Sequence, residues 1–319
     1  MATIDPSWYK EQFTIGLVAA ICTAASATLV QSLNIDQMLP DPNTLAASLS
    51  VFQLKQVPQR ALPLAMASEQ RVEGFVQELA TQQTKIEANF TFNPPKLFQG
   101  KTIEEVPLKS QEKVIALTFD DGPWKDHTDS ILKILQDNDV KGTFFFIGQH
   151  LQQFPEQAKR VVAAGHAVAN HTWNHHYHNV DSTIAAKEIG DTNNLMYKLT
   201  GAKSKIFRPP GGVMDNGLVA YAHSQNYVVA MWSSDAREAS GPTVETLVNN
   251  VVSSASPGGI VLMHDGGGDR STTVAALPIV ITQLRQQGYK FVTLPQLFTM
   301  KQQDEESFTT ATPARPSTP

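Results

Sequence analysis

Cysteine is almost absent from this 319-residue chain, which contains only Cys22, and there is no surplus of basic residues. A single thiol excludes an internal disulfide and any metal site built from several thiolates. The 25 lysines and arginines are outnumbered by 30 aspartates and glutamates, for a formal net charge of −5. Because this balance offers no basic excess to neutralise phosphates, we expect no nucleic-acid partner. Any bound metal must be held by histidine and carboxylate groups.

Charge is also missing from one stretch near the N-terminus, Phe13–Val30, which runs for 18 residues without a charged side chain. That length is at the lower limit for a membrane span and exceeds most signal-peptide cores. We interpret residues 1–32 as a signal peptide or a membrane anchor, with a buried Ala-rich helix as the alternative. Export predicts a protein of the periplasm, the cell wall or the extracellular medium, and anchoring through Phe13–Val30 stays open.

The rest of the chain divides into three parts by composition. Residues 33–107 are polar and contain several prolines, and we predict a spacer of uncertain structure there. Residues 301–319 are rich in Glu, Thr and Pro, which is typical of a disordered tail. We expect a single folded domain between them, over residues 108–300.

Short apolar runs alternate with stretches of helical spacing in this central part. Non-alternating apolar strands, each followed by a helix, indicate a parallel sheet that is buried on both faces. About seven such units predict an α/β fold, a distorted (β/α) barrel, with a doubly wound open sheet as the alternative. The apolar runs begin at Val114, Gly142, Ala167, Val228, Gly259 and Phe291.

Two adjacent carboxylates, Asp120 and Asp121, follow the apolar run that begins at Val114. In either architecture, reactive groups gather at the carboxyl ends of the strands. Adjacent carboxylates repel unless one is neutralised, and a divalent cation does this while leaving the other free as a base. An Asp-Gly turn before Gly122-Pro123 is the structural alternative, and this motif alone does not decide between them.

His171 and His175 are four residues apart in the sequence HTWNH. In a helical turn, this spacing places two imidazoles on one face, where they can converge on one ion. The spacing by itself is a weak signal. Together with Asp121 it forms a set of two histidines and one carboxylate, which leaves positions open for water and substrate as in hydrolytic metal sites.

Two more motifs follow apolar runs, RPPGG at 208–212 and IVLMHD at 260–265. Arg208 can pair with the free carboxylate, and a backbone N–H near Gly211 can serve as an oxyanion donor. His264 can act as a general acid, and Asp235 can orient and charge its imidazole. For each motif taken alone, a surface turn or a rim histidine is the ordinary alternative.

In this order, the four motifs TFDDGP, HTWNH, RPPGG and IVLMHD resemble those of the polysaccharide deacetylases with a NodB-homology domain, carbohydrate esterase family four. The resemblance extends from about Val114 to Leu297. It implies a distorted (β/α) barrel, a bound divalent metal and the removal of N- or O-acetyl groups from polysaccharides. The metal would be Zn²⁺ in the first place, with Co²⁺, Mn²⁺ or Ni²⁺ as alternatives.

The resemblance also implies a role for each matching residue. The residues that resemble the metal ligands are Asp121, His171 and His175. In the same way, Asp120 resembles the catalytic base, Arg208 the residue that orients it, His264 the catalytic acid and Leu262 a residue that lines the acetyl pocket.

The fourth motif of the family, usually Asp, two residues and then Asp-Trp, is altered in this chain. The matching stretch keeps the first Asp as Asp235, to which we assign the support of the acid, but continues with Glu238 and Ala239. Gly211 stands where the family commonly has an aromatic residue. These differences change the walls of the groove and leave the metal chemistry intact, so they bear on the substrate rather than on the reaction.

We therefore predict a hydrolase that acts on carbon–nitrogen bonds other than peptide bonds, in linear amides. The expected substrate is a polysaccharide, with N-acetylglucosamine residues of peptidoglycan as the first choice and a chitin-like glycan as the second. The alternatives are an O-acetyl esterase acting on xylan or another glycan, and a glycan-binding relative without turnover. Trp124, Trp173 and Trp232 are candidates either for stacking on sugar rings or for packing at the rim.

Overall fold

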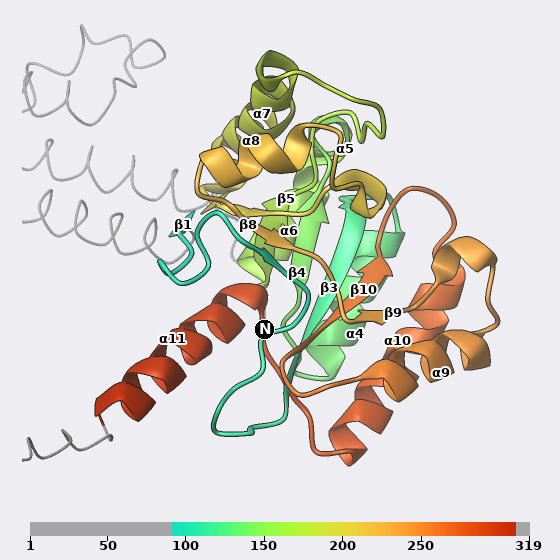
Figure 1. Cartoon of the computed structure of the whole chain (residues 1–319). Helices are drawn as coiled ribbons and strands as arrows, with labels where there is room; N and C mark the ends of the chain where they lie inside the picture. The colour runs from blue at the N-terminus through green and yellow to red at the C-terminus, as the bar shows by residue number, and fades with distance from the viewer. Residues whose placement is uncertain (1–90, 311–319) are drawn as a thin grey trace, which may run out of the picture. The chain divides into compact units, whose positions relative to one another are not determined.

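A curled sheet of nine strands, with all its neighbouring strands parallel, forms the centre of the computed structural model (Figure 1). The structure describes residues 91–310. The strands lie in the order β2-β8-β7-β5-β4-β3-β10-β9, and β11 also pairs with β3. Their bounds are Thr102–Ile103 (β2), Val114–Gly122 (β3), Thr143–Phe146 (β4), Ala167–Asn170 (β5), Ile206–Phe207 (β7), Val228–Ala230 (β8), Ser234–Asp235 (β9), Gly259–His264 (β10) and Lys290–Phe291 (β11). A separate pair joins β1 (Thr91–Phe92) to β6 (Lys203–Ser204).

Helices follow most of the strands and cover the sheet. Figure 1 shows α4, α9 and α10 grouped on one side of the fold, and α7 and α8 on another. The helices are His127–Asp137 (α4), Gly148–Gln153 (α5), Pro155–Ala163 (α6), Ser182–Thr200 (α7), Leu218–Ser224 (α8), Val244–Ser254 (α9), Ser271–Gln286 (α10) and Leu294–Thr310 (α11).

Strand β3 lies between two hydrophobic cores, which explains its unbroken apolar sequence. Ile115 and Leu117 belong to the core formed with α4, α9 and α10, whereas Val114 and Ala116 belong to the core formed with α11. A strand that is buried on both faces needs apolar residues in succession rather than in alternation. The predicted distorted (β/α) barrel is therefore confirmed. Within residues 91–310 no pairing joins β2 to β9, so the curled sheet stays open on that side.

The structure differs from the predicted domain boundaries at the N-terminal side. Residues that we assigned to the spacer belong to the barrel, because β2 pairs with β8 and the side chains of Phe98 and Val106 are buried in the core. The predicted signal peptide or anchor, residues 1–32, and residues 33–90 of the spacer lie outside the described residues. None of the helices between residues 91 and 310 is long and apolar enough to cross a membrane.

The structure also corrects the predicted tail, because α11 continues through residues 301–310. Polar contacts with the segment before β3 hold this part of the helix in place. The Nζ atom of Lys301 donates to the backbone oxygen of Pro107 at 2.9 Å. The carboxylate of Asp304 accepts the backbone N–H groups of Lys109 and Ser110, at 2.6 and 3.0 Å. Composition alone predicted disorder here because it does not reveal such long-range partners.

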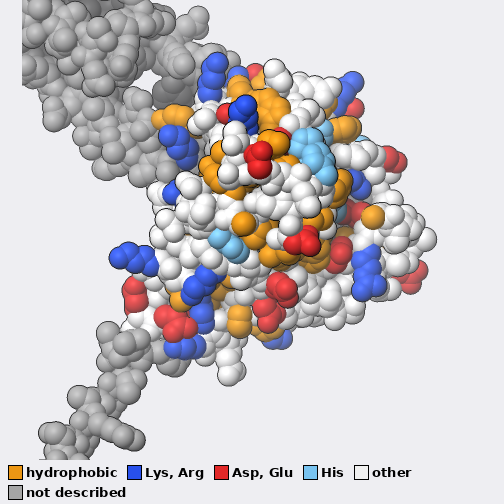
Figure 2. Space-filling view, turned by 45° about the horizontal axis from the view of Figure 1, so that its top comes forward, with side chains coloured by type: hydrophobic (Ala, Val, Ile, Leu, Met, Phe, Trp, Pro, Cys, Tyr) orange, Lys and Arg blue, Asp and Glu red, His pale blue; other side chains and the backbone are white. Residues whose placement is uncertain are grey.

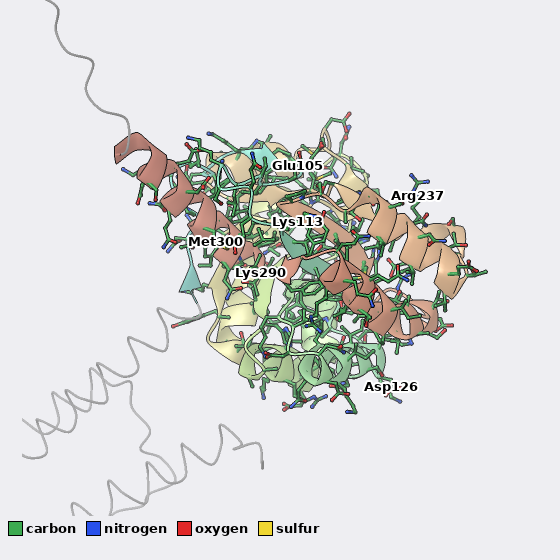
Figure 3. The ribbon with its side chains drawn as sticks, turned by 90° about the horizontal axis from the view of Figure 1, so that it is seen from below. Glu105, Lys113, Asp126, Arg237, Lys290 and Met300 are labelled. Carbon is green, nitrogen blue, oxygen red and sulfur yellow. The ribbon has the colours of Figure 1, made fainter. Side chains whose placement is uncertain are left out.

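The two ends of the sheet carry different chemistry. Figure 3 shows the end with the amino termini of the strands, where Lys113 and Lys290 lie near each other and Met300 lies on α11. There, Lys290 pairs with Glu112 at 2.6 Å, and Lys113 donates to the backbone oxygen of Gln287 at 3.2 Å. The predicted acids and histidines lie at the opposite end, at or just after the carboxyl termini of β3, β5 and β10. The fold therefore places the candidate site at that end.

Candidate metal centre and catalytic site

A bulge in β3 brings two adjacent carboxylates to the same histidine. Asp120 pairs with Phe145 and Gly122 with Phe146, so Asp121 is an extra residue in the strand, and its φ is 71°. In a regular strand, successive side chains point to opposite faces, and a bulge changes this alternation. As a result, Asp120 Oδ2 lies 3.7 Å and Asp121 Oδ1 lies 3.5 Å from Nε2 of His171.

His171 and His175 converge through an irregular loop, not through the helical turn that their spacing predicts. No helix is present over residues 171–175, and Thr172 and His175 have left-handed φ values of 69° and 56°. The centroids of the two imidazole rings are 4.9 Å apart, and His175 Nε2 lies 3.1 Å from Asp121 Oδ1. The Thr172 hydroxyl accepts the N–H of His175 at 3.0 Å and closes the loop.

One ligand atom from each of Asp121, His171 and His175 lies within 4.8 Å of the others. The Oδ1 atom of Asp121 is buried and accepts no hydrogen bond from residues 91–310. The Nδ1 atom of His171 lies 2.7 Å from the backbone oxygen of Arg208. Because a carbonyl only accepts, Nδ1 carries the proton and Nε2 keeps a lone pair for a ligand. These donors therefore fit a divalent ion and leave positions open for other ligands.

Arg208 is fully buried and holds Asp120 in place. Its Nη1 atom donates to Asp120 Oδ1 at 2.7 Å, and its Cζ atom lies 4.1 Å from the centroid of the Phe145 ring. The remaining oxygen of Asp120, Oδ2, faces His171. The other acceptors of the guanidinium are the hydroxyl of Thr118 at 2.9 Å and the backbone oxygens of Ala230 and Met231 at 2.7 and 2.9 Å.

Glu238, and not Asp235, supports His264, which corrects the sequence prediction. One oxygen of Glu238 contacts His264 Nδ1, and the other accepts the backbone N–H of His264 at 3.1 Å and the hydroxyl of Thr273. Asp235 lies level with Leu262 in the sheet and accepts the backbone N–H of Arg237 at 2.7 Å. The turn after β9 brings Glu238, rather than Asp235, level with His264.

The carboxylate of Glu238 sets the charge of His264. Burial lowers the pKa of this imidazole, but the hydrogen bond and charge of Glu238, with the charges of Asp120 and Asp121, raise it to about 9. His264 is therefore protonated at neutral pH, as a general acid must be.

Unlike His264, the candidate metal ligands His171 and Asp121 are in the protonation states that can bind a metal: His171 is neutral and Asp121 is ionised. Burial lowers the pKa of His171 more than Asp120 and Asp121 raise it, so the imidazole is neutral, the form that binds metals. Burial acts to raise the pKa of Asp121, but the neighbouring His175 and His171 lower it below its ordinary value. Asp121 is therefore a carboxylate, which can accept a metal bond.

Glu188 on α7 holds the loop between the two histidines, and the sequence did not point to it. The residue is 3% exposed, and its side chain accepts the backbone N–H groups of Trp173 and Asn174, at 2.9 and 2.8 Å. A single acidic residue on a helix carries no signal in the sequence. Its role emerges only because α7 packs beside the histidine loop.

Asp265 is a third buried carboxyl group near the site, at the end of β10. Burial, together with the charges of Asp121 and Asp120, raises its pKa to about 7, although a 2.6 Å hydrogen bond from the Thr128 hydroxyl acts to lower it. A Cβ atom at Gly122 would lie 2.2 Å from Asp265 Oδ2. The glycine of the DDGP motif is therefore needed for this carboxyl group to pack against β3.

The two predicted substrate-contacting residues also lie at this end of the sheet. Gly211 has a φ of 58° in the short turn Pro210–Gly212, and Leu262 is a 6% exposed residue of β10 beside Thr118. Figure 2 shows histidine side chains next to hydrophobic ones on the face turned toward the viewer. The fold thus gathers the predicted residues at one end of the sheet, and Glu238, rather than Asp235, contacts His264.

A family model described as polysaccharide deacetylase matches residues 108–230. A Bacillus cereus protein named peptidoglycan-N-acetylglucosamine deacetylase is 41% identical over 205 residues, which cover 63% of this chain and 95% of that protein. The peptidoglycan-N-acetylmuramic acid deacetylase PdaC of Bacillus subtilis is 34% identical over 203 residues, 63% of this chain and 42% of PdaC.

Solved structures agree with these sequence matches. A crystal structure of a peptidoglycan N-acetylglucosamine deacetylase, in complex with 4-naphthalen-1-yl-N-oxidanyl-benzamide, superposes with a TM-score of 0.59 at 34% identity. The match covers 63% of this chain and 94% of that chain.

Substituting His175 and His176 one at a time should distinguish the candidate metal ligand from the neighbouring histidine. We expect His175→Ala to weaken Zn²⁺ binding at least about tenfold, because it removes one of three ligands. His176→Ala should bind as the unchanged chain does, since His176 Nε2 faces Glu188 Oε1 at 3.6 Å. Competition with a chromophoric chelator measures both affinities, and circular dichroism checks the fold. Equal losses in the two variants would contradict the assignment.

Proposed function

Because the chain belongs to the polysaccharide deacetylase family, we propose that it removes N-acetyl groups from N-acetylglucosamine residues of peptidoglycan. The observation that carries this proposal is the juxtaposition of a carboxylate and a protonated imidazole beside the three-ligand site. Asp120 and His264 are register partners on the neighbouring strands β3 and β10. A base and an acid on the two sides of a reacting amide are what hydrolysis of an acetamide requires.

Asp120 acts as the base. Its Oδ1 atom is fixed by Arg208 at 2.7 Å, so Oδ2 is left to receive the proton of the attacking water. As the water oxygen bonds to the acetyl carbon, the carbonyl oxygen gains negative charge, and we assign the N–H of Gly211 as a donor to it. Asp121, His171 and His175 would hold a divalent ion, which would supply Lewis-acid chemistry to the acetyl carbonyl.

His264 acts as the acid. Its Nδ1 atom is engaged by Glu238, which leaves the proton on Nε2 for the sugar nitrogen. The C–N bond breaks as this nitrogen takes the proton, and the products are acetate and a free amine. Asp120 then releases its proton and His264 regains one from solvent, which restores the starting charges.

The ligand set favours Zn²⁺ as the metal, because two imidazoles and one carboxylate with open positions are typical of hydrolytic zinc sites. Co²⁺, Mn²⁺ and Ni²⁺ accept the same donors and are the alternatives. Reconstitution of the metal-free chain with each ion, followed by activity, ranks them, and higher activity with another ion would overturn the choice of Zn²⁺.

We also propose that the chain acts outside the cytoplasmic membrane, where peptidoglycan lies. The uncharged stretch Phe13–Val30 supports export or anchoring. A C-terminal epitope tag on the full chain should be digested by protease added to intact protoplasts, or be found in the medium. A tag that stays protected until lysis would contradict export.

The reaction itself is tested by acetate release. The full chain loaded with Zn²⁺ should release acetate from peptidoglycan and from N-acetylglucosamine oligomers, and Asp120→Asn should lower kcat by about 10²–10⁴-fold. The variant should keep its Zn²⁺ affinity, since Asp120 is not among the ligands. Release from acetylated xylan alone would favour an O-acetyl esterase. Zn²⁺ binding without release from any of these glycans would favour a glycan-binding protein.

The pH profile tests the assignment of Glu238. Since the pKa of His264 is raised to about 9, kcat should fall as the pH rises through that value and the acid loses its proton. Glu238→Gln removes the charge that raises this pKa, so the alkaline limb should move to lower pH. Asp235→Asn is the matched control and should leave the limb in place. A shift in the control alone would restore the role first assigned to Asp235.

A further inference from the structure

An exposed aromatic ring, Tyr177, follows the second metal-ligand histidine. Tyr177 is 58% exposed. The centroid of its ring lies 5.1 Å from that of the His175 ring, and the two rings meet edge to face at an interplanar angle of 89°. A large ring is thus presented to solvent directly beside the reacting centre.

The same ring lies on Gly211. A Cβ atom at Gly211 would be 2.6 Å from Cε1 and 3.1 Å from Cδ1 of Tyr177, closer than packed carbon atoms approach. The φ of 58° at Gly211 also favours glycine. The absence of a side chain at position 211 therefore makes room for a ring from a different loop, next to the N–H that we assign to the oxyanion.

The tryptophans considered from the sequence have packing partners instead. Trp232 covers Gly212, where a Cβ atom would be 2.9 Å from Cη2, and its ring lies 5.7 Å from Cζ of Arg208. Trp124 packs against His150 with ring centroids 4.8 Å apart. Trp173 packs against Gly148, where a Cβ atom would be 2.4 Å from Cε3. Tyr177 is the more exposed ring, and packing alone leaves that exposure unexplained.

We propose that Tyr177 is a specificity-determining residue, whose ring stacks on the pyranose face of the sugar that carries the reacting acetyl group. This inference rests on the proposed function. The negative face of an aromatic ring attracts the slightly positive C–H groups on one face of a pyranose, and it shields them from water.

The test uses the full chain loaded with Zn²⁺ and an N-acetylglucosamine tetramer as the probe. Tyr177→Leu keeps apolar bulk against His175 and Gly211 but removes the flat face, and it should raise KM about five- to tenfold with kcat within about twofold. Tyr177→Phe keeps the face and should leave both constants within about twofold. Ile184→Ala on α7, at a residue that is 42% exposed, is the matched control and should match the unchanged chain.

Several outcomes would overturn the stacking role. An unchanged KM in Tyr177→Leu, a loss in Tyr177→Phe as large as in Tyr177→Leu, or a loss confined to kcat would each contradict it. The Zn²⁺ affinity of each variant must equal that of the unchanged chain, because a KM change caused by a disturbed His175 would also contradict it. If the unchanged chain releases no acetate, the proposed function fails, and calorimetric binding of the tetramer to the chain and to Tyr177→Leu still decides the stacking role.

Discussion

The buried guanidinium of Arg208 lies at the centre of the site. Each of its N–H donors needs an acceptor, because an unpaired buried charge costs several kcal/mol. Arg208 meets this requirement with Asp120 and Thr118 of β3 and with two backbone oxygens at the end of β8. Its own backbone oxygen faces Nδ1 of His171 at 2.7 Å. A single buried cation therefore couples the orientation of Asp120, the tautomer of His171 and the arrangement of three strands.

The metal centre depends on backbone conformations that are unfavourable in isolation. Asp121, Thr172 and His175 all have left-handed φ values, and such residues persist only where the surroundings determine them strongly. Here the surroundings are the bulge of β3 and the buried carboxylate of Glu188, which binds the N–H groups between the two histidines. The left-handed backbone conformations occur where they bring together the side-chain atoms of Asp121, His171 and His175.

At two positions where the sequence departs from the family pattern, the three-dimensional contacts show how the site accommodates the change. The longer Glu238 reaches His264 from the turn after β9, so the imidazole of His264 is charged although the motif is altered. The space above Gly211 is occupied by the ring of Tyr177, which comes from the histidine loop. Both substitutions look like losses in the sequence. Glu238 contacts His264 from the altered motif position itself, whereas Tyr177, which covers Gly211, comes from a different loop.

The sequence by itself determined the parallel sheet and most of the chemistry. Strands buried on both faces must be apolar in succession, and reactive residue types at their carboxyl ends mark Asp120, Asp121, His171 and His264 without any knowledge of contacts. Only the tertiary structure decided that Glu238 replaces Asp235, that α11 continues past residue 300, and that the histidines converge through a loop instead of a helix. These features depend on which distant segments meet and on backbone angles set by that packing. Neither the contacts between distant segments nor these backbone angles can be read from the local sequence.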